Sequence, residues 1–232
     1  MELPLNLLGV YLSIANGLIM FINFALDSNQ FYGKIAPIFI FTKPLIVQFI
    51  FLHLYLNMEE IPLQIIAWCI FCFIGDIILL FRSMIANKLG CISFLFSQII
   101  ITHYYGVTFS IEKLKSPLFL CIVLPPAILL LFALYPKALK YKPVYADGIV
   151  YLASLIVALA SSVLRSDKYD PSSIEFLSSC IGHFFFIVSD YFLINATILD
   201  LTDKYNIIVL PTYIIALIGI STGVILAQNK VE

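Results

Sequence analysis

Residues 63–82 read LQIIAWCIFCFIGDIILLFR, a run that is apolar except for Gln64, Asp76 and the terminal Arg82. An α-helix needs roughly 20 mostly apolar residues to cross the hydrocarbon core of a bilayer. The run therefore predicts a transmembrane helix, and it places one carboxyl group inside the membrane.

The rest of the chain has the same character. Of its 232 residues, 62% are hydrophobic and only 12% are charged, and the net charge is −1. Soluble domains average about 45–50% apolar and about 25% charged residues. This composition excludes a soluble enzyme and a disordered chain, and the near-zero net charge argues against a nucleic-acid partner.

Short polar breaks divide the chain into eight apolar runs of spanning length. They lie at 5–26, 35–56, 63–82, 89–109, 117–135, 146–164, 175–197 and 206–227. We expect an all-α integral membrane protein, a bundle of eight transmembrane helices with short loops that forms a single domain over residues 1–232. Both termini then lie on one side of the membrane. Pro125-Pro126 and Pro211 are expected to kink their helices, and five cysteines in apolar runs do not indicate a disulfide framework.

Ionisable side chains within the predicted spans point to a functional site. Each costs about 2.5–3.5 kcal/mol to insert, and such residues persist where they face a protein interior or a water-filled cavity. With a helical rise of about 1.5 Å per residue, Lys43, Asp76 and Asp190 all lie about 9–12 Å from the membrane surface opposite the termini. Tyr151 lies about 7 Å below that surface. Side chains from four helices therefore share one layer.

Two histidines lie deeper, His103 and His183, both about 20 Å from the same surface. We expect a polar chamber that opens toward that surface and has these histidines at its floor. The three histidines of the chain, His53 included, show no metal-ligand spacing, and a zinc site needs three or four ligands within reach. The sequence thus predicts no metal site.

A simpler interpretation of the polar layer is a buried ion pair that locks helices together. One Lys with one Asp would satisfy it, but a second carboxyl leaves excess negative charge unless one carboxyl stays protonated. A protonated and an ionised carboxyl side by side are what general acid–base catalysis requires. Ser189 points about 100° away from Asp190 on the helix, which makes it a poor candidate for a nucleophile activated by its neighbour.

These residues occur in short motifs: Lys43-Pro44, Gly75-Asp76, His103-Tyr104, Tyr151 and Ser189-Asp190. Their order and their places in spans two to seven resemble the YhhN family of eight-span membrane proteins, which includes the vertebrate transmembrane protein 86 lysoplasmalogenases. The resemblance implies hydrolysis of the vinyl ether bond of lysoplasmalogens, giving a fatty aldehyde and glycerophosphoethanolamine or glycerophosphocholine.

The resemblance also implies roles for single residues. Asp76 and Asp190 would be catalytic, and a second set would bind substrate or support the site: Lys43, Tyr151, His103 and Ser189. No cofactor is implied, and the partners are a lysophospholipid substrate and the bilayer. The expected location is the endoplasmic reticulum or another internal membrane in a eukaryote, or the inner membrane in a bacterium.

Two other classes of protein fit parts of this pattern. A proton-coupled carrier of lipids or small molecules also uses intramembrane Asp and Lys residues. A metal-dependent lipid hydrolase needs a histidine cluster, which this sequence lacks. Release of aldehyde from lysoplasmalogen distinguishes an enzyme from a carrier, and activity in the presence of a chelator excludes the metal-dependent class.

Overall fold

A computed structural model describes residues 5–26, 37–81, 83–107, 109–140, 142–167, 169–198 and 202–229. Over these residues the secondary structure is helical, without strands. The helices are α1 (Leu8–Leu26), α2 (Pro37–Asn57), α3 (Leu63–Leu79), α4 (Met84–Tyr105), α5 (Ile111–Leu114), α6 (Pro117–Ile122), α7 (Leu124–Lys140), α8 (Lys142–Leu164), α9 (Ile174–Ile198) and α10 (Thr202–Gln228), with a 3₁₀ turn at Arg165–Asp167.

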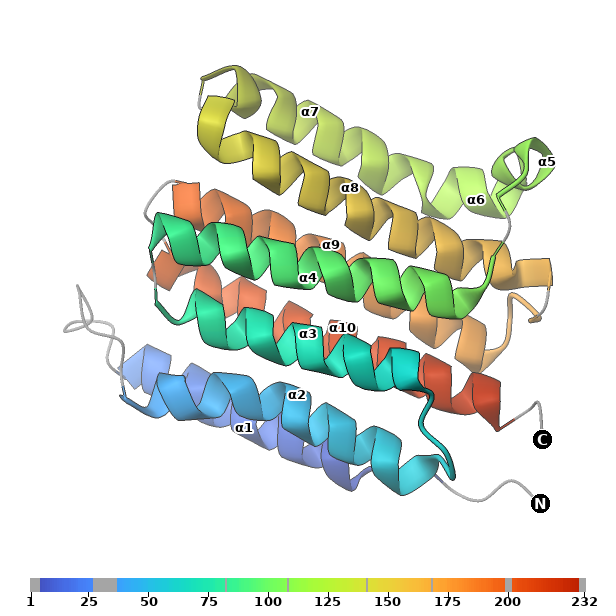
Figure 1. Ribbon diagram of the computed structural model, residues 1–232, viewed down its shortest axis with the longest axis horizontal. Coiled ribbons are helices and arrows are strands. Elements are labelled where there is room, and N and C mark those ends of the chain that lie inside the picture. The colour runs from blue at the N-terminus through green and yellow to red at the C-terminus, as the bar shows by residue number, and fades with distance from the viewer. Residues whose placement is uncertain are drawn as a thin grey trace.

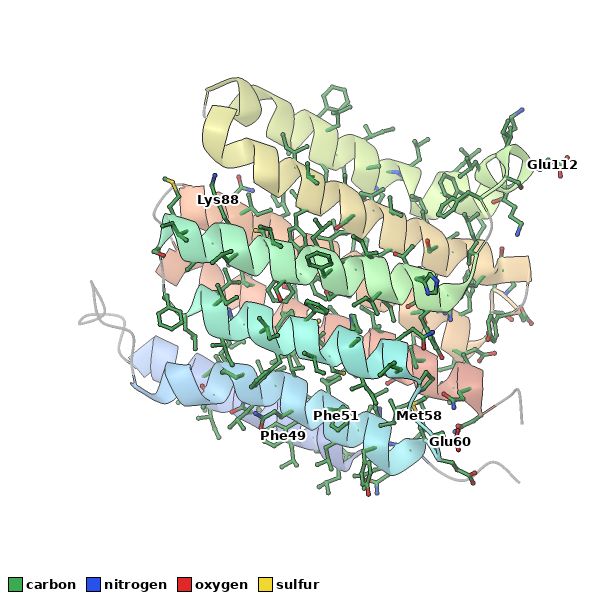
Figure 2. The ribbon with its side chains drawn as sticks, in the orientation of Figure 1. Phe49, Phe51, Met58, Glu60, Lys88 and Glu112 are labelled. Carbon is green, nitrogen blue, oxygen red and sulfur yellow. The ribbon has the colours of Figure 1, made fainter. Side chains whose placement is uncertain are left out.

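The long helices lie side by side in a bundle with their axes roughly aligned, and helices adjacent in sequence, such as α3 and α4, run in opposite directions (Figure 1). The α1–α2 pair forms one edge, α7 and α8 form the other, and α3, α4, α9 and α10 lie between them (Figure 1). Charged Lys88 and Glu112 lie at opposite ends of the bundle, and Phe49 and Phe51 lie on α2 away from both (Figure 2). This distribution suits a bundle whose middle lies in hydrocarbon.

Three helical segments among the described residues are long and apolar enough to cross a membrane: Met84–Tyr105, Ile174–Asn195 and Ile208–Gln228. Shorter apolar helical segments lie at Leu8–Met20, Leu63–Leu79, Pro117–Ala133 and Gly148–Leu164. The all-helical class is therefore confirmed and the chain has the character of a membrane protein, whereas the count of eight spans stays a prediction.

Helices occupy each of the eight apolar runs, although the fifth run is divided. There α6 ends at Ile122 and α7 begins at Leu124, directly before Pro125 and Pro126. Proline lacks the N–H that would continue the hydrogen bonds of the preceding turn, so the expected kink takes the form of a break. By contrast, α10 continues through Pro211.

Both ends of the described chain meet the connection between α2 and α3. The backbone N–H of Asn6 donates to Oδ1 of Asn57 at 2.6 Å, and Nε2 of Gln228 donates to the carbonyl of Glu60 at 2.9 Å. Glu60 is labelled at this end of the bundle in Figure 2. The start of α1 and the end of α10 thus lie at the same end, as an even number of crossings requires.

Backbone-to-backbone packing joins α9 to α10 through glycine. A Cβ atom on Gly182 would lie 2.6 Å from the backbone nitrogen of Ile220 and 2.8 Å from the carbonyl oxygen of Ala216. A Cβ on Gly219 would lie 2.8 Å from Cα of Gly182. Small residues permit such close approach of helices in membranes, where no hydrophobic effect drives helices together. The glycines therefore set the spacing of the two helices that carry Asp190 and Tyr213.

We expect Gly182→Ala to destabilise the protein by about 1–3 kcal/mol, because the added methyl group meets backbone atoms that cannot rotate away. The matched control is Gly148→Ala on α8, whose Cβ would meet only the Ile194 side chain, at 3.5 Å or more. That control should be neutral or stabilising by up to about 1 kcal/mol, since alanine favours helix more than glycine does. Thermal unfolding in detergent measures both, and equal effects would contradict the prediction.

Candidate functional site

Asp76 lies near the end of α3 with 1% of its surface exposed. Nζ of Lys43, from α2, lies 3.6 Å from its Oδ1, and the hydroxyl of Tyr213, from α10, donates to its Oδ2 at 2.9 Å. A buried carboxylate is stable only when it is paired and hydrogen-bonded. The three side chains therefore join α2, α3 and α10 at one point.

The backbone around Lys43 is held from α1. Nδ2 of Asn16 donates to the carbonyl of Thr42 at 2.6 Å, and the next residue but one, Pro44, lacks a backbone donor. Lys43 keeps 15% of its side chain exposed, whereas its partner Asp76 is buried. Lys43 is thus the more accessible partner of this ion pair.

Asp190 lies on α9, with 4% of its surface exposed. The hydroxyl of Tyr151, from α8, donates to its Oδ2. Among the described residues, no cation lies at ion-pair distance from Asp190. The Lys43 ammonium forms its ion pair with Asp76. The two carboxyls therefore have unequal surroundings: each has a tyrosine hydroxyl, but only Asp76 has an ammonium group.

An aromatic cluster packs against the tyrosines of both tyrosine–carboxyl pairs. The ring centroid of Phe94, on α4, lies 6.3 Å from that of Tyr151 and 6.2 Å from that of Tyr213. Phe186 on α9 lies 5.6 Å from Tyr213 in an edge-to-face arrangement. Gly75 permits this packing, since a Cβ there would lie 2.7 Å from the Phe94 ring. The glycine before Asp76 thus makes room for the wall of the site.

Both carboxyls open into one small cavity, which we call the polar pocket. Its volume is about 30 Å³, close to the volume that one water molecule occupies in the liquid. Its lining residues come from five helices: Lys43, Asp76, Leu79, Phe94, Ser189, Asp190, Leu193, Val209, Leu210 and Tyr213. The polar pocket places two acids and one base beside an apolar wall.

The family model described as the YhhN family matches residues 38–224. The chain belongs to the YhhN family. Comparison with curated proteins and with solved structures finds no match.

The matched region of this YhhN chain contains all the polar-pocket residues. It also contains the predicted site residues that the structure brings together, namely Lys43, Asp76, Tyr151, Ser189 and Asp190. Ser189 lines the pocket, but its hydroxyl donates to the carbonyl of Val209 at 3.1 Å. This bond ties α9 to α10, which fits a supporting role for the serine.

The prediction that His103 and His183 form the floor of the polar chamber was wrong. His103 is exposed on α4 and lines a different cavity, together with Gln98, Ile99, Thr102, Gly106, Val107, Ser154 and Val157. His183 is fully buried, and its Nε2 lies 2.9 Å from the Tyr105 hydroxyl. Their depth was estimated along the helix, which says nothing of the direction in which each ring points.

Sequence reasoning missed Tyr213 and Phe94. Tyr213 is one of 13 tyrosines and Phe94 one of 20 phenylalanines, so residue type alone does not single them out. The nearest sequence signal was Pro211, two positions before Tyr213, which had been interpreted only as a possible kink. Their roles depend on which helices pack together.

The described residues contain no group of three or more His, Cys, Asp or Glu side chains that could hold a metal ion. All five cysteines are free thiols, and Cys72 lies buried on the same helix as Asp76. The chemistry that this YhhN site can perform is therefore considered below from its carboxyls, hydroxyls and ammonium group.

We expect Lys43→Met and Asp76→Asn each to destabilise the protein, by about 3–5 kcal/mol where a buried charge is left unpaired. The double variant should lose less than the sum of the two single losses, because it leaves neither charge alone. Unfolding in detergent provides the double-mutant cycle. Losses that add within about 0.5 kcal/mol would show that the two groups do not interact.

Proposed function

We propose that the protein hydrolyses the vinyl ether bond of lysoplasmalogens, giving a fatty aldehyde and glycerophosphoethanolamine or glycerophosphocholine. The observation that carries the proposal is the polar pocket, in which Asp76 and Asp190 face one buried cavity and only Asp76 has a cation beside it. Membership of the YhhN family is consistent with this reaction.

Hydrolysis of a vinyl ether begins when a proton is delivered to the alkene carbon beyond the ether-bearing carbon, which leaves an oxocarbenium ion. Water then adds to the cationic carbon and gives up a proton. The hemiacetal collapses as its hydroxyl loses a proton and the glycerol oxygen gains one. The site must therefore supply an acid, a carboxylate that stabilises the cation, and a place for one water molecule.

Asp190 is the better candidate for the acid. Its Oδ2 accepts a hydrogen bond from the neutral Tyr151 hydroxyl, and the Lys43 ammonium forms its ion pair with Asp76 instead. Of two neighbouring carboxyls, the one outside the ion pair is the one that keeps its proton. Oδ1 is then the oxygen that carries the proton to carbon. Tyr151 acts as a positioning residue, since it fixes the orientation of the carboxyl group.

Asp76 is the better candidate for the carboxylate. The Lys43 ammonium and the Tyr213 hydroxyl both stabilise its ionised form. A fixed negative charge beside the reacting carbon stabilises the oxocarbenium ion without reorganisation of solvent. The same carboxylate can accept the proton of the attacking water, for which the pocket volume of about 30 Å³ leaves room.

The membrane arrangement belongs to the same proposal. All eight apolar runs cross the bilayer, so the polar pocket lies within the hydrocarbon layer and meets a lipid substrate there. The protein is then a multi-pass protein of the endoplasmic reticulum or another internal membrane in a eukaryote, or of the inner membrane in a bacterium.

Purified protein in detergent should release fatty aldehyde from lysoplasmalogen and should not act on the matching lysophospholipid with a saturated alkyl ether, which has no alkene to protonate. The activity should survive EDTA. Transport of protons or lipid into proteoliposomes without aldehyde release would favour the carrier. Loss of activity in EDTA that Zn²⁺ restores would favour metal-dependent hydrolysis.

We expect Asp76→Asn and Asp190→Asn each to lower kcat/KM by about 10²–10⁴-fold, the usual contribution of a positioned acid or base. The amide has nearly the same shape but does not exchange a proton at neutral pH. Asp170→Asn, in the exposed turn before α9, is the control and should keep full activity. Full activity in either pocket variant would remove that aspartate from the mechanism.

A further inference from the structure

A larger cavity lies between α4 and α8, and its lining shares no residue with that of the polar pocket. Its volume is about 640 Å³, within the range of roughly 300–1,000 Å³ that is typical of ligand pockets. Gln98 and Ile99 on α4 face Ser154 and Val157 on α8 across it. We call it the α4–α8 groove, and the chemistry proposed above does not use it.

The lining of the groove begins one helical turn after Phe94, which lines the polar pocket. Gln98 follows Phe94 by one helical turn on α4, and Ser154 follows Tyr151 by one turn on α8. The Ser154 hydroxyl donates to the carbonyl of Tyr151 at 2.6 Å. The rings of Phe94 and Tyr151, whose centroids lie 6.3 Å apart, pack against each other one turn before Gln98 and Ser154. A molecule with one end at the carboxyls and the rest in the groove must therefore move these rings apart.

The polar pocket is too small for a whole lipid. With a volume of about 30 Å³, it admits a water molecule or a few reacting atoms. In a lysoplasmalogen the hydrocarbon chain begins at the bond that is cleaved. The chain must therefore leave the pocket at once and lie in a neighbouring cavity.

We propose, on the basis of the proposed function, that the α4–α8 groove binds the single hydrocarbon chain of the lysophospholipid whose vinyl ether lies at Asp76 and Asp190. The groove lining on this side runs from Gln98 to Gly106, which spans about 12 Å along the helix axis. A lipid chain spans one leaflet, about half of the roughly 30 Å hydrocarbon core. The groove therefore covers most of the length of such a chain.

The groove lining has exposed apolar residues, past which a hydrocarbon chain can enter, and one buried polar residue, which can bind the polar end of that chain. Ile99 and Val157 are 52% and 45% exposed, so the groove opens sideways between the helices, where a chain enters from the bilayer. Gln98 is fully buried, and neither its Nε2 nor its Oε1 has a hydrogen-bond partner among the described residues. It lies at the end nearest Phe94, where its N–H groups reach the ether or glycerol oxygen at the start of the chain.

Photolabelling of the full-length protein in detergent tests the site without relying on activity. The probe is an alkyl-ether lysophospholipid, which has no vinyl bond, with a diazirine at the end of its chain. We expect labelled peptides from residues 102–107 and 154–157, and suppression of the labelling by excess lysoplasmalogen. Labelling elsewhere, or labelling that lysoplasmalogen does not suppress, would overturn the proposal.

If the groove binds the hydrocarbon chain, a substitution in its lining should lower activity on long-chain substrates only. Val157→Trp should lower kcat/KM for a long-chain lysoplasmalogen by about tenfold or more, the discrimination that even one methylene can give in an apolar pocket. A short-chain substrate should be unaffected. The control is Val150→Trp, on the same helix and 59% exposed but outside the groove lining, which should leave both substrates unchanged. Equal loss for both chain lengths, or no loss, would contradict the proposal.

The two experiments separate this proposal from the proposed function. Labelling in the groove without aldehyde release would support the chain site and reject the hydrolase. Aldehyde release with labelling outside the groove would support the hydrolase and reject the chain site.

Discussion

Lys43 and Asp76 form an ion pair inside the helix bundle, where either charge alone would be costly. Their contact at 3.6 Å joins α2 to α3, and the Tyr213 hydroxyl extends it to α10. Two consecutive helices and the distant α10 are thereby joined at one point. The second carboxyl, Asp190, meets this arrangement at the polar pocket, so its chemical environment depends on where the ion pair holds its neighbours.

The asymmetry between the two carboxyls gives the site its chemical character. Asp76 and Asp190 each accept a hydrogen bond from a tyrosine, but the ammonium group lies beside Asp76 alone. Paired carboxyls in unequal environments divide the roles of acid and base between them. The Phe94 ring lies between the two tyrosines and keeps the two pairs distinct.

The two cavities differ in volume and in the charge of their linings. The polar pocket has charged side chains and a small volume, whereas the α4–α8 groove has a large volume and no Asp, Glu, Lys or Arg among its described lining residues. A substrate that is polar at one end and a long chain at the other matches two adjoining cavities of this kind.

The sequence by itself determined the helical class, the positions of the long helices and the grouping of Lys43, Asp76 and Asp190 at one level along the bundle. These properties are local, because composition decides where an apolar helix forms and the rise per residue decides how deep a side chain lies. Only the tertiary structure decided which side chains face one another. His103 follows Phe94 by nine residues, half a turn around the helix, so it lies on the other face although its depth suggested the site. Tyr213 reaches Asp76 because α10 packs within the bundle, and that packing depends on contacts between helices that no single helix encodes.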